Sequence, residues 1–259
     1  MTRPRIPPPQ MLAAVTHDGR RDEVAVEQPL EIRVDGEPLA VTMRTPGHDE
    51  ELALGFLYGE GLIDEPRHAG PTADFANNTI DVTGPLTRDP ATRRFYTTSS
   101  CGVCGKGALE EVGIHAPKAA PGPRVDRATL AALPDRLRQP AFERTGGMHA
   151  TGLFTPGGEL ILVREDVGRH NAMDKVIGAA LAQDLLPLRH HILCVSGRLA
   201  FELVQKAAIA GAPILVGVGA PTSLAIELAA DRGMTLAGFA RRGSVNVYAG
   251  VERLIERLV

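Results

Sequence analysis

The sequence predicts a small α+β roll followed by an α/β domain. In the N-terminal third, alternating apolar residues flank Asp35-Gly36, and a helical pattern and further short strands follow. Beyond the stretch "HAPKAAPGPRVD", apolar strands alternate with helical patterns, which is typical of a sheet covered on both faces. That stretch is rich in proline, alanine and glycine, so it marks the predicted boundary. We expect a disordered lead at 1–15, an α+β domain at 16–120 that ends in a Cys-x-x-Cys loop and linker, and an α/β domain at 121–259.

The elements of the first domain follow in order from local patterns. "DEVAVEQPLEIRVDGEPLAVTMRT" predicts a hairpin with its turn at Asp35-Gly36. "DEELALGFLYGEGLI" predicts a helix, because Leu52, Phe56 and Ile63 lie near helical spacing behind an acidic first turn. "NTIDVTG" and "RRFYTTS" fit two more strands, and a short helix is expected at about 108–112.

The second domain reads as alternating strands and helices. "MHATGLF" and "ELILVRED" predict a strand pair around Pro156-Gly157-Gly158, and a helix is expected from about Asn171. The remaining predicted elements are the strand "HHILCVSG", the helix "LAFELVQKAAIAGA" closed by Gly211, the strand "PILVGVG", the helix "SLAIELAADRG" and the strand "MTLAGFARRG".

Composition excludes several classes of protein. A net charge of −3 over 259 residues gives no global basic field, so nucleic acid is not expected as a partner. Three cysteines are too few, and odd in number, for a secreted disulfide scaffold. The first ten residues lack the apolar core of a signal peptide, and no window reaches the roughly 18 apolar residues of a membrane helix. We therefore expect a soluble, cytoplasmic protein with reduced thiols.

Cys101 and Cys104 form a Cys-x-x-Cys pair within "YTTSSCGVCGKG". Such a pair can bind zinc, cycle as a dithiol or carry a sulfur atom. Ser99 and Ser100 are good N-cap residues for a following helix, and the helix dipole and Lys106 would favour a thiolate. The segment is also rich in glycine, and a mobile, low-pKa thiol suits a carrier that must visit two partners.

Two zinc alternatives remain open beside the carrier. A structural zinc site needs two further ligands, and Cys194 lies in an apolar strand, where a buried inert thiol is the expected state. His48-Asp49-Glu50 matches the H-x-E motif of zinc nucleobase deaminases, with the cysteine pair as the remaining ligands. However, Ser100 replaces the usual proline before the first cysteine, and the same residues read as a plain helix start. The sequence therefore predicts no metal site.

Polar residues cluster at four strand-to-helix junctions of the second domain. Ligands of open α/β sheets occupy the crevice beyond the carboxyl ends of the strands, where free N–H groups and arginines hold phosphates. The junctions together predict a nucleotide-like ligand, although no Walker A loop, G-x-G-x-x-G fingerprint or G-x-S-x-G elbow is present. The candidates are Arg164, Glu165, Asp166, Arg169, His170, Asn171, Ser196, Gly197, Arg198, Thr222, Ser223, Arg241 and Arg242.

Structural roles compete with ligand binding at several of these positions. A helix cap or a buried ion pair would demand the same residue types as Arg164, Asp166, His170 and Arg198. His149, which follows Gly146-Gly147, is likewise open to a functional or a structural role.

Six segments, in this order, resemble the FdhD/NarQ family of formate dehydrogenase accessory sulfurtransferases. They are "RTPGHDEELALGFLYGEGLI", "SSCGVCGKG", "TGGMHATGLF", "REDVGRHNAMDKVIG", "VSGRLAFELVQKAAIAGAPILV" and "GFARRGSVNVY", and they span 44–248.

The resemblance implies a specific activity. Members accept sulfur from a cysteine desulfurase as a cysteine persulfide and pass it to the molybdenum cofactor, bis(molybdopterin guanine dinucleotide), for formate dehydrogenase. By resemblance, Cys101 is the persulfide carrier and Cys104 its neighbour. A cofactor-binding chaperone without sulfur chemistry is the alternative.

The resemblance also implies a binding stretch, a fold and an oligomer. The cofactor-binding stretch falls on Phe239, Ala240, Arg241, Arg242, Gly243 and Ser244, to which we add Arg198 and His170 from the neighbouring junctions. GDP is the expected partial mimic of the cofactor. The second domain is expected to resemble cytidine deaminases, without their zinc chemistry, and the chain to form a homodimer.

Overall fold

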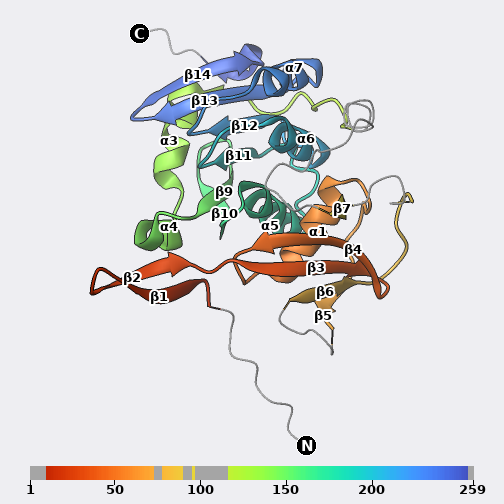
Figure 1. Ribbon diagram of the computed structural model, residues 1–259. Helices are drawn as coiled ribbons and strands as arrows, with labels where there is room; N and C mark the ends of the chain where they lie inside the picture. Colours follow the sequence, from red (N-terminus) through yellow and green to blue (C-terminus); the bar gives the residue numbers. More distant parts are fainter. Residues whose placement is uncertain (1–9, 73–77, 90–94, 97–115, 256–259) are drawn as a thin grey trace, which may run out of the picture.

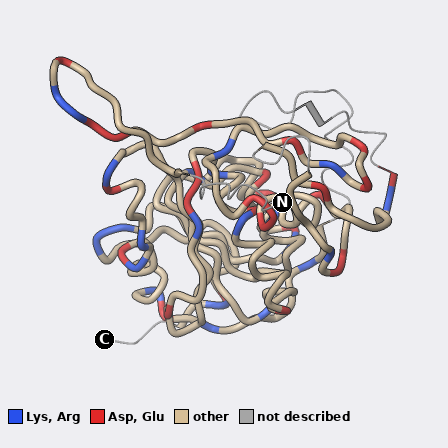
Figure 2. The backbone as a smooth tube through the Cα atoms, turned by 90° about the horizontal axis from the view of Figure 1, so that it is seen from below, with Lys and Arg blue, Asp and Glu red and all other residues tan. Residues whose placement is uncertain are grey.

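The computed structural model describes residues 10–72, 78–89, 95–96 and 116–255 (Figure 1). Cys101, Cys104 and the expected short helix at about 108–112 lie outside the described residues. The prediction of a disordered lead over 1–15 is wrong for its last residues, because a strand begins at Leu12. This strand, β1 (Leu12–His17), pairs with β2 (Arg20–Ala25) in a separate antiparallel hairpin. Figure 2 shows this hairpin projecting from the rest of the molecule, with acidic and basic residues along it.

A five-stranded sheet in the order β5-β6-β3-β4-β7 forms the N-terminal part. Its centre is the predicted hairpin, in which Asp35 and Gly36 both have positive φ, as a two-residue type I′ turn requires. The predicted helix is also present, with three acidic residues in its first turn. The elements are β3 (Gln28–Val34), β4 (Glu37–Arg44), α1 (Asp49–Gly59), β5 (Ala69–Pro71), β6 (Thr79–Val82) and β7 (Phe95–Tyr96).

A six-stranded sheet in the order β10-β9-β11-β12-β13-β14 forms the larger part. The three middle strands β11, β12 and β13 run parallel, and β9 and β14 flank them in the antiparallel sense. The strands are β9 (His149–Phe154), β10 (Leu160–Asp166), β11 (Ile192–Val195), β12 (Ile214–Gly217), β13 (Thr235–Arg241) and β14 (Ser244–Ala249). The predicted strand pair around Pro156 is confirmed.

Helices cover both faces of this sheet, as the alternating pattern predicted (Figure 1). Along the strands, Leu193 and Leu215 pack in one core with α5 (Arg169–Ala182), α6 (Phe201–Ile209) and α7 (Ser223–Asp231). The alternate residues Ile192 and Ile214 pack in a second core with α3 (Arg127–Arg136). The result is a mixed fold with several sheets. A likeness to cytidine deaminases stays a prediction.

The two parts share an interface between α1 and α5. A Cβ at Gly55 of α1 would overlap the carbonyl oxygen of Asp174, and a Cβ at Gly178 of α5 would overlap that of Glu51. The glycines therefore let the two helix backbones touch. Leu181 of α5 also packs into the core of the N-terminal part.

The C-terminal part of the described chain fastens the segment that precedes α3. The buried Arg253, in the short 3-10 helix Val251–Arg253, donates to the carbonyls of Pro121, Ala120 and Gly233 at 2.9, 3.0 and 2.7 Å. Next to it, β15 (Leu254–Ile255) pairs with β8 (Val125–Asp126). No helix among the described residues is long and apolar enough to cross a membrane.

Candidate functional site

Polar loops from four strands meet at one edge of the six-stranded sheet. The carboxyl ends of the parallel strands β11, β12 and β13 define this edge. Antiparallel pairing brings the start of β9 to the same edge, because Thr151 lies opposite Val195. In the same way Arg241, at the end of β13, lies opposite Ser244, at the start of β14. The predicted ligand-binding edge is thus a real meeting point of these segments.

Three glycines allow the loops to pack against each other along this edge. A Cβ at Gly219 would lie 2.9 Å from Cα of Arg198 and 2.9 Å from the carbonyl oxygen of Gly197. A Cβ at Gly238 would lie 3.1 Å from the carbonyl oxygen of Gly219. Gly219 N–H donates to the Gly197 carbonyl at 3.0 Å, and Phe239 N–H donates to the Gly219 carbonyl at 3.1 Å. Gly197, Gly219 and Gly238 thus form a row, here called the glycine row, along which the backbones that follow β11 and β12 touch each other and β13.

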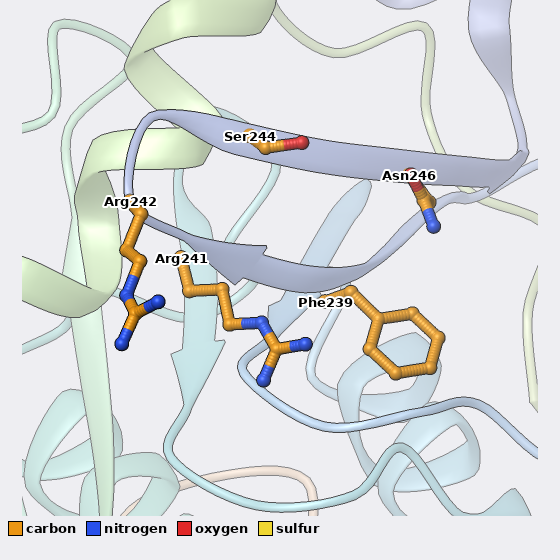
Figure 3. A pocket seen from close by; sticks show the side chains of 5 residues that line it. All are labelled: Phe239, Arg241, Arg242, Ser244 and Asn246. Carbon is orange, nitrogen blue, oxygen red and sulfur yellow. The ribbon is translucent and has the colours of Figure 1, made fainter.

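The predicted stretch from Phe239 to Ser244 forms a cavity of about 420 Å³ (Figure 3). Phe239, Arg242 and Gly243 all have positive φ, so the chain turns sharply between β13 and β14. The Arg241 guanidinium lies 6.0 Å from the centre of the Phe239 ring. The cavity is lined by Phe239, Arg241, Arg242, Ser244 and Asn246.

Two details of this stretch differ from the sequence prediction. Ala240 is fully buried in the core beneath the sheet, so its side chain does not line the cavity. Asn246 lines the cavity but was not predicted. Strand alternation is the signal that would have found it, because Ser244 and Asn246 are two residues apart on β14.

The other predicted residues, His170 and Arg198, lie with His149 and Arg169 nearer to β9. His170 begins α5, and its Nε2 is 3.8 Å from a carboxylate oxygen of Glu202. Burial, followed by the charges of Arg169, His170 and Arg198, lowers the pKa of His149. The structure therefore brings these four side chains into one electrostatic neighbourhood.

Three of the other candidates at the β10–α5 junction are structural. Arg164 donates to both carboxylate oxygens of Glu51, at 2.6 and 2.7 Å. Glu165 accepts from the backbone N–H groups that begin helix α4 (Pro140–Thr145). Asp166 forms a buried ion pair with Lys175 at 2.7 Å. Arg164 and Asp166 hold the two parts of the molecule together, and Glu165 holds α4 against β10. Their polar groups are therefore engaged in structural contacts.

Further candidates also have structural partners. Asn171 donates to the Met43 carbonyl at 2.8 Å, and Thr222 caps α7. His48 is exposed at the start of α1, where its Nδ1 lies 3.2 Å from Glu51, so the H-x-E match is a helix start here. Among the residues that the structure describes, no group of three or more His, Cys, Asp or Glu is placed to hold a metal ion.

Comparison with known proteins identifies the relatives of this chain. The profile of the FdhD/NarQ family matches residues 25–255. Sulfur carrier protein FdhD of Streptomyces coelicolor is 54% identical over 256 residues, with 92% of this chain and 91% of the relative covered. The protein of the same name in Sulfolobus acidocaldarius is 47% identical over 235 residues, covering 90% and 91%.

A solved structure shares the fold. The crystal structure assigned as a formate dehydrogenase accessory protein from Desulfotalea psychrophila is 27% identical, with a TM-score of 0.72. It covers 94% of this chain, and this chain covers 97% of it. With the family profile matched from the end of β2 to β15, the chain belongs to the FdhD/NarQ family.

Proposed function

We propose that this protein is a cytoplasmic sulfurtransferase of formate dehydrogenase maturation. It takes sulfur from a cysteine desulfurase as a persulfide on Cys101 and passes it to the bis(molybdopterin guanine dinucleotide) molybdenum cofactor. The observation that carries the proposal is the arginine- and phenylalanine-lined cavity at the strand edge of a chain that also has a Cys-x-x-Cys pair. The names of the relatives, sulfur carrier protein FdhD, support the same role.

The donor set of the cavity fits the nucleotide end of this cofactor. Arg241 and Arg242 supply planar guanidinium groups, which match the oxygens of a diphosphate. Phe239 is 36% exposed and offers an aromatic face on which a purine can stack. Ser244 and Asn246 add hydrogen-bonding groups that can fix the orientation of the base or the ribose. When bound, the cofactor supplies the acceptor for the sulfur.

The proposed sulfur transfer takes two steps, each an attack of a thiolate on a sulfur–sulfur bond. The Cys101 thiolate attacks the terminal sulfur of the desulfurase persulfide; an S–S bond forms on Cys101, the donor S–S bond breaks, and the donor cysteine leaves as a thiolate. The Cys104 thiolate then attacks Sγ of Cys101, so that a disulfide forms and the terminal sulfur leaves as hydrosulfide for the cofactor. Because the two cysteines are oxidised in this step, a thiol reductant must restore the dithiol before the next cycle.

Cys194 provides a matched control for this chemistry. It is fully buried in β11, and burial raises the pKa of its thiol, so it stays protonated and unreactive. A sulfur carrier must be accessible, and Cys194 is not.

The test is intact-protein mass spectrometry after incubation with a cysteine desulfurase, pyridoxal phosphate and L-cysteine. We expect wild type, Cys104→Ala and Cys194→Ala to gain about 32 Da, one sulfur atom, and Cys101→Ala to gain none. A wild type that gains no sulfur from an active desulfurase would contradict the proposal.

A cofactor chaperone without sulfur chemistry is the second candidate, because the described residues that line the cavity can bind a nucleotide by themselves. The Cys101→Ala variant distinguishes sulfur transfer from a chaperone function. If this variant binds GDP like wild type but no longer supports formate dehydrogenase activity, sulfur transfer is required; if activity persists, the protein is a chaperone.

A further inference from the structure

Four basic side chains lie at the same edge of the six-stranded sheet, where β9 begins and β11 ends. His149 begins β9, Arg169 and His170 begin α5, and Arg198 is exposed three residues beyond the end of β11. We call these four residues the histidine–arginine cluster. They do not line the cavity at Phe239, so the mechanism proposed above leaves most of them without a role.

The acidic groups near the cluster have partners elsewhere or offset only part of its charge. Asp166 is buried against Lys175 at 2.7 Å and accepts from the backbone N–H of Gly168 at 2.8 Å. Glu202 of α6 lies 3.8 Å from His170 Nε2. Among the described residues, exposed Arg198 forms no ion pair, so its guanidinium is available to an anion.

Backbone donors lie beside these side chains. In the part of the chain that the structure describes, the N–H groups of Gly197 and Arg198 donate to no acceptor. Gly197 has no side chain to cover them, and a Cβ there would lie 3.3 Å from Nδ1 of His149. Adjacent N–H groups, an imidazole and a guanidinium are the donors that bind a phosphate group.

We propose that the histidine–arginine cluster is a second anion subsite. It binds the terminal phosphate of the nucleotide ligand whose base lies against Phe239 and whose phosphate nearer the ribose pairs with Arg241 and Arg242. The proposal rests on the proposed function and deepens it. The loop of Arg198 follows β11 and that of Phe239 belongs to β13, and two strand spacings amount to about 10 Å. A nucleoside diphosphate can bridge that distance over the glycine row.

The subsite has a proton-linked signature. Burial and the charges of Arg169, His170 and Arg198 lower the pKa of His149, and Asp166 opposes them only in part. His149 is therefore mainly neutral at neutral pH and becomes a better anion ligand when protonated. A bound phosphate would raise the pKa of His149, so affinity must increase as the pH falls through the histidine range.

Calorimetric titration of the full chain with inorganic pyrophosphate, GDP and guanosine tests the proposal. We expect Arg198→Ala to weaken pyrophosphate and GDP about tenfold or more and to leave guanosine unchanged. Arg189→Ala is the matched control, since Arg189 is also exposed but lies three residues before β11, at the opposite edge of the sheet. Phe239→Ala has the reverse pattern, with weaker guanosine and GDP and unchanged pyrophosphate.

The pH arm uses His149→Gln. Wild type is expected to bind pyrophosphate more tightly at about pH 6 than at about pH 8, and the variant to lose most of this difference. Pyrophosphate binding that ignores both Arg198→Ala and pH overturns the subsite, even if GDP binds at Phe239. Pyrophosphate binding that depends on Arg198 without any guanosine or GDP binding supports the subsite and contradicts the guanine nucleotide of the proposed function.

Discussion

Asp166 joins both parts of the molecule through one buried carboxylate. It pairs with Lys175 at 2.7 Å and accepts from the backbone N–H of Thr45 at 3.1 Å, and Lys175 donates to the Thr45 carbonyl at 2.8 Å. The side chains of Asp166 and Lys175 are 0% and 1% exposed. Removal of either partner would leave the other charge buried without compensation.

Lys175→Met tests the buried pair. We expect it to lower the free energy of unfolding by about 3 to 5 kcal/mol, because Asp166 stays buried and loses its counterion. Urea denaturation followed by circular dichroism measures the change. Arg144→Gln, which breaks the exposed pair with Glu23, is the control and should alter stability far less. Equal losses in the two variants would show that burial of the pair is unimportant.

Glu51 makes the same interface sensitive to acid. Burial alone would raise its pKa, but hydrogen bonds and charge from Arg164 and His48 outweigh burial and lower the pKa from 4.5 to about 2. Between these values the unfolded chain binds more protons than the folded one, so stability falls as the pH decreases through this window.

Glu51→Gln should remove this acid sensitivity. We expect wild type to lose more stability than the variant between about pH 6 and pH 3, whereas the contribution of the group is constant above about pH 5.5. Urea midpoints of both proteins over this range measure the difference. Parallel pH profiles for the two proteins would exclude Glu51 as the sensitive group.

At the scale of elements, α1 and α5 touch through backbone atoms because Gly55 and Gly178 face each other's helices. Alanine favours an isolated helix over glycine by about 1 kcal/mol, so helix propensity alone predicts stabilisation. The lack of space for a Cβ predicts the opposite, since both overlaps involve a rigid backbone carbonyl.

Gly55→Ala and Gly178→Ala decide between these effects. We expect each to lower the free energy of unfolding by about 1 to 3 kcal/mol or more, as overpacking in a closed interface does. Thermal denaturation detects the loss. Gly157→Ala is the control, because the nearest atom to a Cβ there is 3.7 Å away and its φ is not positive. Stabilisation by Gly55→Ala would mean that the helices separate readily.

Elements with strong local signals were predictable, and those that depend on packing were not. The turn at Asp35-Gly36 and the strands around Pro156 follow from turn chemistry and alternation. Helix α3 was not predicted, because Pro134 lies within it and its stability comes from Leu130 and Leu133 packing on the sheet. Helix α4 was not predicted either; its first N–H groups are satisfied by Glu165, which is distant in sequence.

The same distinction between local signals and distant contacts applies to the residues of the candidate site. The loop of Arg241 and Arg242 and its cavity were predictable from a glycine turn at a strand end. In the sequence, Arg164 and Asp166 resemble these loop residues, because they too are charged and lie at the end of a strand. Yet their partners Glu51 and Thr45 are 113 and 121 residues away. Local patterns carry no information on such pairs, so charge alone could not distinguish arginines that line the cavity from arginines with structural partners.

At the scale of the whole molecule, the two parts pack together through α1 and α5, and the proposed cofactor site lies at one edge of the six-stranded sheet in each chain. Bis(molybdopterin guanine dinucleotide) has two nucleotide arms. A symmetric dimer would offer one edge to each arm, which gives the expected homodimer a functional reason.

GDP titration checks this arrangement. We expect two equivalent GDP sites per dimer, with the mass of the dimer established by light scattering. A stoichiometry of one GDP per dimer would contradict a separate edge for each arm.

The contacts of Arg253 also set an order of events during synthesis. Arg253 holds Pro121, 132 residues earlier, and at ribosomal rates of 5–20 residues per second this separation takes roughly 7 to 26 s to translate. Throughout that interval the cysteine pair has already been made, while the segment behind it still lacks the side chain that fastens it. Stable attachment of that segment therefore trails its own synthesis by at least this interval.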